Sequence, residues 1–261
     1  ELWQQTEWPE LQVYFTSVTD HWATATISGP NARNVITKVC DDIDFCAENF
    51  GFMEWRDGNI ADVAARVFRI SFTGELSYEV NVSANYGHHV WEKLIEAGAE
   101  FNITPYGTET MHVLRAEKGF IIVGQDTDGS MTPADMNMDW VIGKNKSFSF
   151  IGERSLGRSD SVRANRKQLV GLKAIDPLTV LPEGSQIVND PEQAIPMDMQ
   201  GHVTSSYYSA NMGHSIAMAV IKGGLDRMGD IVYCPSADGT NAAAQIVSHV
   251  FYDPTGERQN A

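Results

Sequence analysis

Residues 68–82 constrain the fold most, because they predict two strands separated by a glycine. Apolar residues alternate with polar ones over residues 68–72, as on a strand with one apolar face. Gly74 then supplies a bend at a position where a residue without a Cβ costs least. Beyond the bend, Tyr78 and Glu79 project from opposite faces of the second strand. We therefore expect Glu79 to be a single carboxylate fixed on a rigid strand.

A carboxylate in this position can accept two parallel hydrogen bonds. The amino-pyrimidinone edge of a pterin offers two adjacent N–H donors, so a bidentate pairing would fix orientation as well as add binding energy. Glutamates on strand faces are also common as solvated residues. On this stretch alone, Glu79 is either a ligand-binding carboxylate or a solvated strand residue.

The composition of the chain restricts the classes of molecule that it is expected to bind. The chain has 261 residues, which suffices for one large or two ordinary domains. Its formal net charge of −15 argues against nucleic acid, whose phosphates it would repel. No apolar run approaches the roughly 18 residues of a membrane span, so we expect no membrane partner. The odd number of cysteines, without C-x-x-C spacing, favours reduced thiols in the cytoplasm and no metal site.

The first half of the chain predicts a mixture of helices and strands. A helix end is expected over residues 1–9, strands over 11–18 and 21–28, and short helices over 32–39 and 132–140. The Asp57-Gly58 pair predicts a hairpin turn between strands at 52–55 and 60–72. Two longer helices are expected, an amphipathic one over residues 84–97 and another over 108–118 that ends at Gly119.

The second half of the chain predicts short antiparallel strands. Residues 152–166 are polar and indicate a linker or a solvent-facing helix. Six strand-like runs follow, mostly separated by Gly or Pro, at residues 168–173, 186–188, 202–206, 215–221, 230–233 and 242–250. This spacing favours a small barrel or sandwich. We expect an α+β fold with a mixed α/β domain over residues 1–160 and a β-domain over 161–261.

Several motifs resemble one family. Residues 72–80, Phe-Thr-Gly-Glu-Leu-Ser-Tyr-Glu-Val, resemble the TGE-x-G-[FY]-E-[IV] element of the glycine-cleavage aminomethyltransferase (T-protein) family. Further resemblances to family motifs lie at residues 114–119, 124–126, 132–133, 140–144, 201–205 and 216–219. In order and spacing they cover nearly the whole chain. The resemblance implies a T-protein-like, tetrahydrofolate-binding fold with a mixed α/β part followed by a small antiparallel β-barrel.

The resemblance also implies site residues. In the family, the glutamate that matches Glu79 holds the pterin edge, and the aromatic residue that matches Phe72 lies at the folate site. Phe72 replaces a tyrosine that is common in the family. We expect Tyr78, Arg115 and Tyr252 at the folate site as well, Tyr252 through a looser match. No metal ligand is implied.

One branch of the family is more similar still, the α subunits of heterotetrameric sarcosine oxidases, which residues 106–129 and 251–254 resemble. This implies a C-terminal region that accepts the one-carbon unit of sarcosine as 5,10-methylenetetrahydrofolate, within a flavin-dependent oxidoreductase. The partners would be the β, γ and δ subunits. FAD, FMN and NAD would bind elsewhere in the complex, and no G-x-G-x-x-G fingerprint occurs here. The family's catalytic aspartate would precede Glu1, so no catalytic residue is assigned and the fragment alone is expected to be inactive.

Two alternatives stay open. The first is a stand-alone folate-dependent aminomethyltransferase or demethylase of the same fold, which the intact mass of the native complex would distinguish. The second is a non-catalytic scaffold, which a native enzyme that forms no methylenetetrahydrofolate from sarcosine would support.

Overall fold

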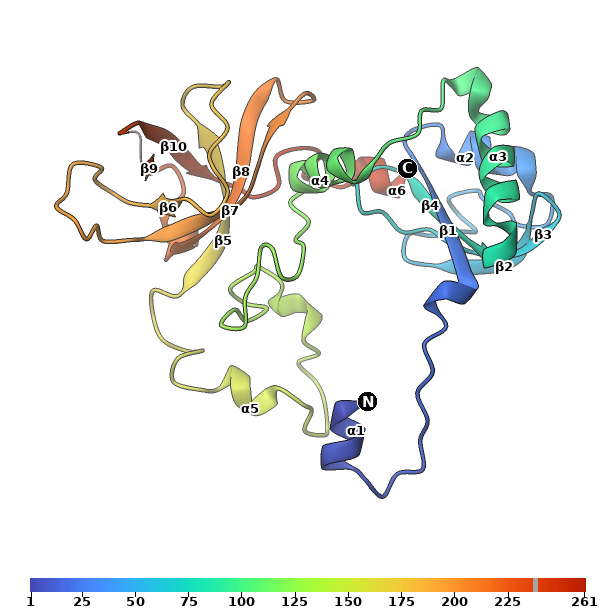
Figure 1. Ribbon diagram of the computed structural model, residues 1–261, viewed down its shortest axis with the longest axis horizontal. Coiled ribbons are helices and arrows are strands. Elements are labelled where there is room, and N and C mark those ends of the chain that lie inside the picture. The colour runs from blue at the N-terminus through green and yellow to red at the C-terminus, as the bar shows by residue number, and fades with distance from the viewer. Residues whose placement is uncertain (237–238) are drawn as a thin grey trace. The chain divides into compact units, whose positions relative to one another are not determined.

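The computed structural model describes residues 1–236 and 239–261 (Figure 1). These residues form two compact units. The first comprises Glu1–Ser71, Glu75–Pro105 and Glu257–Ala261, and the second Phe72–Gly74 and Tyr106–Gly256. These units divide the chain differently from the expected domain boundary at residue 160. Within the described residues, no helix combines the length and apolar character needed to cross a membrane.

The first unit contains a four-stranded antiparallel sheet with the order β1-β4-β3-β2. Its strands are β1 (Trp22–Ser28), β2 (Trp55–Ile60), β3 (Val63–Phe68) and β4 (Ser77–Ser83). One face of the sheet packs against α2 (Ala32–Ile36) and α3 (Gly87–Gly98), and these elements share one apolar core. The remaining helical segments are α1 (Leu2–Glu7), η1 (Thr19–His21), η2 (Thr37–Val39), η3 (Ala84–Tyr86), η4 (Ala99–Phe101) and α6 (Glu257–Asn260).

The strand before Gly74 faces the opposite way from our expectation. Its buried residues alternate and are Val63, Ala65 and Val67. Phe68, the last residue of β3, therefore projects away from this core, so the apolar face predicted for residues 68–72 is wrong. Arg69 continues the buried side at 2% exposure, because its guanidinium donates to the backbone oxygens of Phe50 and Ala261.

The turn between β2 and β3 also differs from the prediction. It lies at Ala61 and Asp62, whose φ angles are 49° and 64°, and not at Asp57-Gly58. Two successive left-handed residues form the primed turn whose twist matches that of the flanking strands. Gly58 lies within β2, where a Cβ would come within 2.5 Å of the Ile43 side chain. Close packing, and not a turn, therefore requires this glycine.

Other expectations for the first half have mixed outcomes. The long helices are confirmed as α3 and as α4 (Thr108–Glu117), and Gly119 follows α4 with a φ of 75°. The strand predicted over residues 11–18 is absent from the described chain, and the helix predicted over 132–140 is reduced to η5 (Asp139–Val141). Both segments lack the buried periodic face that would stabilise a regular element.

The second unit contains a six-stranded antiparallel sheet with the order β6-β7-β8-β5-β10-β9 (Figure 1). The strands are β5 (Lys167–Ala174), β6 (Gln186–Ile187), β7 (Gly201–Ser209), β8 (His214–Lys222), β9 (Ile231–Pro235) and β10 (Asn241–Val247). A bridge between Val188 and Tyr233 links its two edges, so the sheet is a nearly closed barrel. All six predicted strands are therefore confirmed. The other helical segments of this unit are α5 (Glu153–Leu156) and η6 (Gly224–Arg227).

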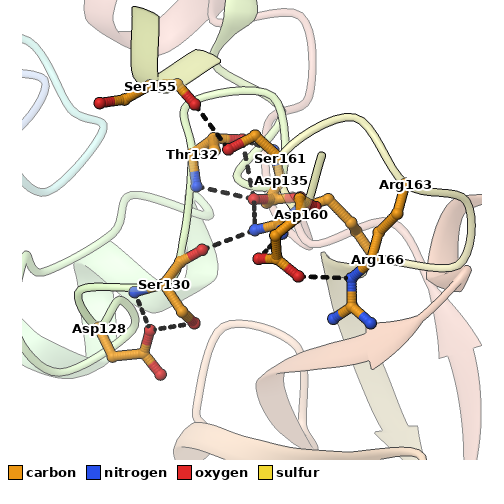
Figure 2. A network of polar contacts seen from close by, with 9 residues as sticks. All are labelled: Asp128, Ser130, Thr132, Asp135, Ser155, Asp160, Ser161, Arg163 and Arg166. Atoms are coloured by element: carbon orange, nitrogen blue, oxygen red, sulfur yellow. Dashed lines mark hydrogen bonds and ion pairs between the residues drawn. The ribbon is translucent and has the colours of Figure 1, made fainter. Parts of the chain in front are cut away.

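Arg166 organises the polar segment that precedes the barrel (Figure 2). Its guanidinium donates to both carboxylate oxygens of Asp135 at 2.8 and 2.7 Å, and to Asp160 at 2.9 Å. The amide and hydroxyl of Thr132 also donate to Asp135, at 2.7 and 2.8 Å. The segment with the composition of a linker is thus held to the loop around Asp135 by charge-assisted hydrogen bonds.

Candidate functional site

The structure places Glu79 in a row of side chains that crosses the four-stranded sheet. On the two neighbouring strands, Thr26 of β1 and Phe68 of β3 are its cross-strand partners. Trp55 of β2 pairs in turn with Phe68. Because directly opposed residues project from the same face, these four side chains lie together on the face away from α2 and α3.

The carboxylate of Glu79 is half-buried and unpaired. Burial raises the pKa of Glu79 above the ordinary value for a glutamate. Within residues 1–236 and 239–261, no donor hydrogen-bonds to this carboxylate and no cation forms an ion pair with it. A partly desolvated charge without a partner costs free energy. A ligand that brings N–H donors would offset that cost.

The adjacent rows on the same face show what Glu79 lacks. Each contains polar side chains that pair across the strands: Ser28 with Ser77 at 2.8 Å, Thr24 with Asn81 at 2.6 Å, and Arg66 with Asp57 at 2.8 Å. The polar side chains in the rows on either side of Glu79 therefore form their hydrogen bonds with other side chains of the same sheet. The row of Glu79 supplies aromatic neighbours in place of a polar partner.

Those aromatic neighbours provide a surface for a planar ring. Phe68 is partly buried, and Trp55 is 49% exposed. The guanidinium of Arg66 lies 4.4 Å from the centre of the Trp55 ring and holds it by a cation–π contact. Since neighbouring strands lie about 4.8 Å apart, the Glu79 and Phe68 side chains can contact one small heterocycle together.

Tyr78 lies on the opposite face from Glu79, within the core of the first unit. Its ring packs edge-on against Phe45, with centroids 5.3 Å apart, and against Phe50 at 5.9 Å. Its hydroxyl is buried and has no hydrogen-bond partner among the described residues. The structure therefore places Tyr78 beside Glu79 along the chain but separates their side chains by the thickness of the sheet.

Arg115 is fully buried in the second unit and is already hydrogen-bonded. It donates to Asp126 at 2.5 Å, to the Ser205 hydroxyl at 2.6 Å and to the backbone oxygen of Phe120 at 3.0 Å. Asp126 also accepts from Thr204 at 2.6 Å. The guanidinium thus connects α4 to β7, and both of its terminal nitrogens donate hydrogen bonds within the second unit.

Phe72 and Tyr252 also belong to the second unit, and both are partly buried. The amide of Tyr252 donates to the backbone oxygen of Glu117 at 2.9 Å. Sequence reasoning assigned these two residues to the site by resemblance and missed Phe68, Trp55 and Thr26. The alternation of buried residues upstream of Phe68 was the signal that could have identified its outward orientation.

Two family models together match most of the chain. The model described as the GCVT N-terminal domain matches residues 2–146. The glycine cleavage T-protein C-terminal barrel domain matches residues 167–253, which include all six strands of the barrel.

Comparison with individual proteins also finds relatives that match nearly the whole chain. The chain is 46% identical to the sarcosine oxidase subunit alpha of Corynebacterium sp. (strain U-96), over 100% of this chain and 27% of that protein. It is 37% identical to the subunit of the same name from Rhizobium meliloti, over 99% of this chain and 26% of that protein. The chain therefore spans about a quarter of the length of these relatives. The crystal structure of aminomethyltransferase T from Bartonella henselae shares the fold, with a TM-score of 0.72 and 20% identity over 89% of this chain and 60% of that one.

Proposed function

Because this chain belongs to the glycine-cleavage T-protein family, we propose that it binds tetrahydrofolate through Glu79 and accepts a one-carbon unit as part of a sarcosine oxidase α subunit. The observation that carries the proposal is the half-buried Glu79 carboxylate, which has no partner among the described residues and lies beside Phe68 on one sheet face. The similarity to sarcosine oxidase α subunits, at 46% identity over the whole chain, supports the choice of enzyme.

Each side chain has a defined role in this proposal. The two oxygens of Glu79 accept the adjacent N–H groups of the pterin edge, which fixes the ring in one orientation. Phe68 packs against a face of the ring, and Trp55 extends the aromatic surface. Phe72 and Tyr252 remain proposed contacts, whereas the guanidinium of Arg115 is committed to Asp126 and Ser205.

The proposed chemistry takes place on folate. Formaldehyde condenses with N5 and N10 of tetrahydrofolate, so that its C=O bond is replaced by two C–N bonds and the oxygen leaves as water. When the iminium reacts directly, its C=N bond is replaced in the same way and the amine leaves in place of water. The chain positions the nucleophile and excludes water from it. The oxidation of the N-methyl amine, with its FAD, FMN and NAD, and the β, γ and δ subunits are proposed to lie outside these residues.

Calorimetric titration of the stable analogue folinate tests this assignment. Glu79→Gln replaces one acceptor with a donor that faces the donors of the pterin. We therefore expect the affinity of this variant for folinate to be about 100-fold lower than that of the wild-type protein. Glu48→Gln is the matched control, because Glu48 is an exposed glutamate of the same unit and lies outside the sheet.

Two results would contradict the proposal. One is binding of folinate with equal affinity to the wild-type protein and to Glu79→Gln. The other is the absence of folinate binding in the wild-type protein together with its native partners, which would favour the scaffold alternative.

A further inference from the structure

The barrel unit contains a second candidate binding site, formed by residues outside the proposed folate contacts. A cleft of about 710 Å³ lies between Asn137, the segment around η6 and the end of β10. Its lining includes Leu225, Met228, Val247 and His249. A volume of this size falls in the range of small-molecule sites.

The lining of the cleft offers no side chain that could form an ion pair with a strongly charged ligand. None of its residues is an aspartate, glutamate, lysine or arginine, although such residues make up 20% of the chain. At its rim, the apolar side chains of Leu225 and Met228 are 40% and 45% exposed, so a ligand in the cleft can contact both. An uncharged, largely apolar ligand is complementary to this lining.

Two polar side chains of the cleft can orient a ligand through hydrogen bonds. The amide nitrogen of Asn137 donates to the backbone oxygen of Leu169 at 2.9 Å and lies 3.4 Å from Nδ1 of His249. Asn137 thus uses its N–H groups on the protein and keeps its carbonyl oxygen as an acceptor. His249 accepts at Nδ1, so its proton is on Nε2, and burial, which lowers the pKa of His249, keeps the ring neutral. Neither the Asn137 oxygen nor Nε2 has a partner among the described residues.

The imidazole of His249 is also held in place. At Gly119, where φ is 75°, a Cβ would approach Cδ2 of His249 to 2.9 Å and its backbone oxygen to 2.6 Å. Backbone and ring are therefore in close contact, which limits movement of the ring. A donor and an acceptor fixed beside apolar walls form a preorganised recognition element.

We propose that this cleft binds an uncharged aromatic nitrogen heterocycle that carries one ring N–H and one ring nitrogen acceptor, such as a fused azole. The N–H of the ligand donates to the Asn137 oxygen, its second nitrogen accepts from Nε2 of His249, and its ring packs against Met228 and Leu225. The proposal does not depend on the folate assignment, since Glu79 and its neighbours belong to the other unit.

Benzimidazole, which is neutral at pH 7.5, is the probe. The full-length protein is labelled with ¹³C on the methionine methyl groups and titrated, and Met212 is the internal control. Met212 is 39% exposed in the same unit and does not line the cleft. We expect the Met228 methyl resonance to shift saturably and the Met212 resonance to stay unchanged. We also expect 1-methylbenzimidazole, which lacks the N–H, to bind about five-fold more weakly.

Substitutions complete the test. Met228→Ala at the exposed rim should weaken benzimidazole binding by about five-fold, whereas Met212→Ala should leave it unchanged. His249→Phe keeps a ring of similar size but removes the Nε2 donor, so it should weaken benzimidazole and its 1-methyl analogue alike and leave the preference for benzimidazole, which depends on Asn137, in place. The proposal is overturned if the Met228 resonance does not shift saturably, if Met212 shifts equally, or if Met228→Ala binds benzimidazole as tightly as the wild-type protein.

Discussion

Glu79 and Phe68 lie opposite each other on the antiparallel strands β4 and β3, and their side chains project from the same face of the sheet. This pairing places a partly desolvated carboxylate beside an aromatic ring. In the next row of the sheet, the carboxylate of Asp57 does have a partner within the protein, because Arg66 forms an ion pair with it. Glu79 has no such partner among the described residues, so its burial is better explained by a ligand than by stability of the sheet.

Substitution of Glu79 should separate stability from binding. Because burial raises its pKa in the folded state, Glu79 binds protons more tightly when folded, and the resulting stability is lost as pH rises through that pKa. Glu79→Gln removes the buried charge and should raise the free energy of unfolding at pH 7 by about 0.5 kcal/mol, a value discounted for solvent screening of a half-exposed group. Urea denaturation measures this, and a loss of stability above about 1 kcal/mol would show a structural role instead.

The affinity for folinate should depend on the protonation of Glu79. Only the carboxylate accepts both pterin N–H groups, so the affinity should fall as pH decreases through the raised pKa of the free protein. Calorimetric titrations at several pH values between 4 and 8 measure the effect. Glu79→Gln should show a weak and nearly pH-independent affinity, and an identical pH profile in that variant would assign the dependence to another group.

Phe68 should contribute through its aromatic ring. Phe68→Leu keeps an apolar side chain at the same position but removes the ring face, so folinate affinity should decrease by about ten-fold. Phe101→Leu is the control, because Phe101 packs against the core of the same unit. Equal affinities for the two variants would exclude Phe68 from the site.

Arg166 should determine the stability of the segment before the barrel. Arg166→Ala leaves the buried carboxylate of Asp135 without its main partner and should cost about 3 kcal/mol. Arg163→Ala removes an exposed ion pair to Asp160 and should change stability by less than about 0.5 kcal/mol. Denaturation of both variants, monitored by fluorescence, tests this difference. Equal effects would mean that the contacts of Arg166 do not stabilise the unit.

The same cluster predicts a loss of stability in acid. Burial raises the pKa of Asp135, but hydrogen bonds from Arg166 and Thr132 outweigh that effect and lower it overall. A lowered folded-state pKa gives stability that is present above the unfolded-state value and is lost as pH falls through the folded-state value. Arg166→Ala should therefore reduce the acid dependence of stability, measured between pH 6 and 2.

Local sequence patterns were sufficient to predict the barrel strands, the helix α3 and the faces of β4. Glycine and proline separate the six barrel strands, and the apolar periodicity of α3 identified that helix. The opposite faces of Tyr78 and Glu79 followed from strand alternation alone. The hairpin turn did not, because one of its two left-handed residues is Ala61, a residue type that rarely adopts a positive φ, whereas Asp57-Gly58 has the usual composition of such a turn.

Long-range contacts explain what the sequence did not predict. We assigned Arg69 to the polar face of the strand before Gly74, but it is buried, and its burial depends on the distant backbone oxygens of Phe50 and Ala261. Arg115 is paired in part with Ser205, 90 residues further along the chain. Neither partner can be identified from local periodicity. The aromatic neighbours of Glu79 likewise depend on the register between strands.

The pKa of Glu79, measured by NMR from its carboxyl ¹³C resonance without and with saturating folinate, tests the central claim most directly. The free protein should show a pKa above the ordinary value for a glutamate, because the carboxylate is partly desolvated and unpaired among the described residues. In the complex this pKa should fall, because the pterin N–H groups stabilise the charged form. An unchanged pKa in the presence of bound folinate would contradict the assignment of Glu79 as the pterin-binding residue.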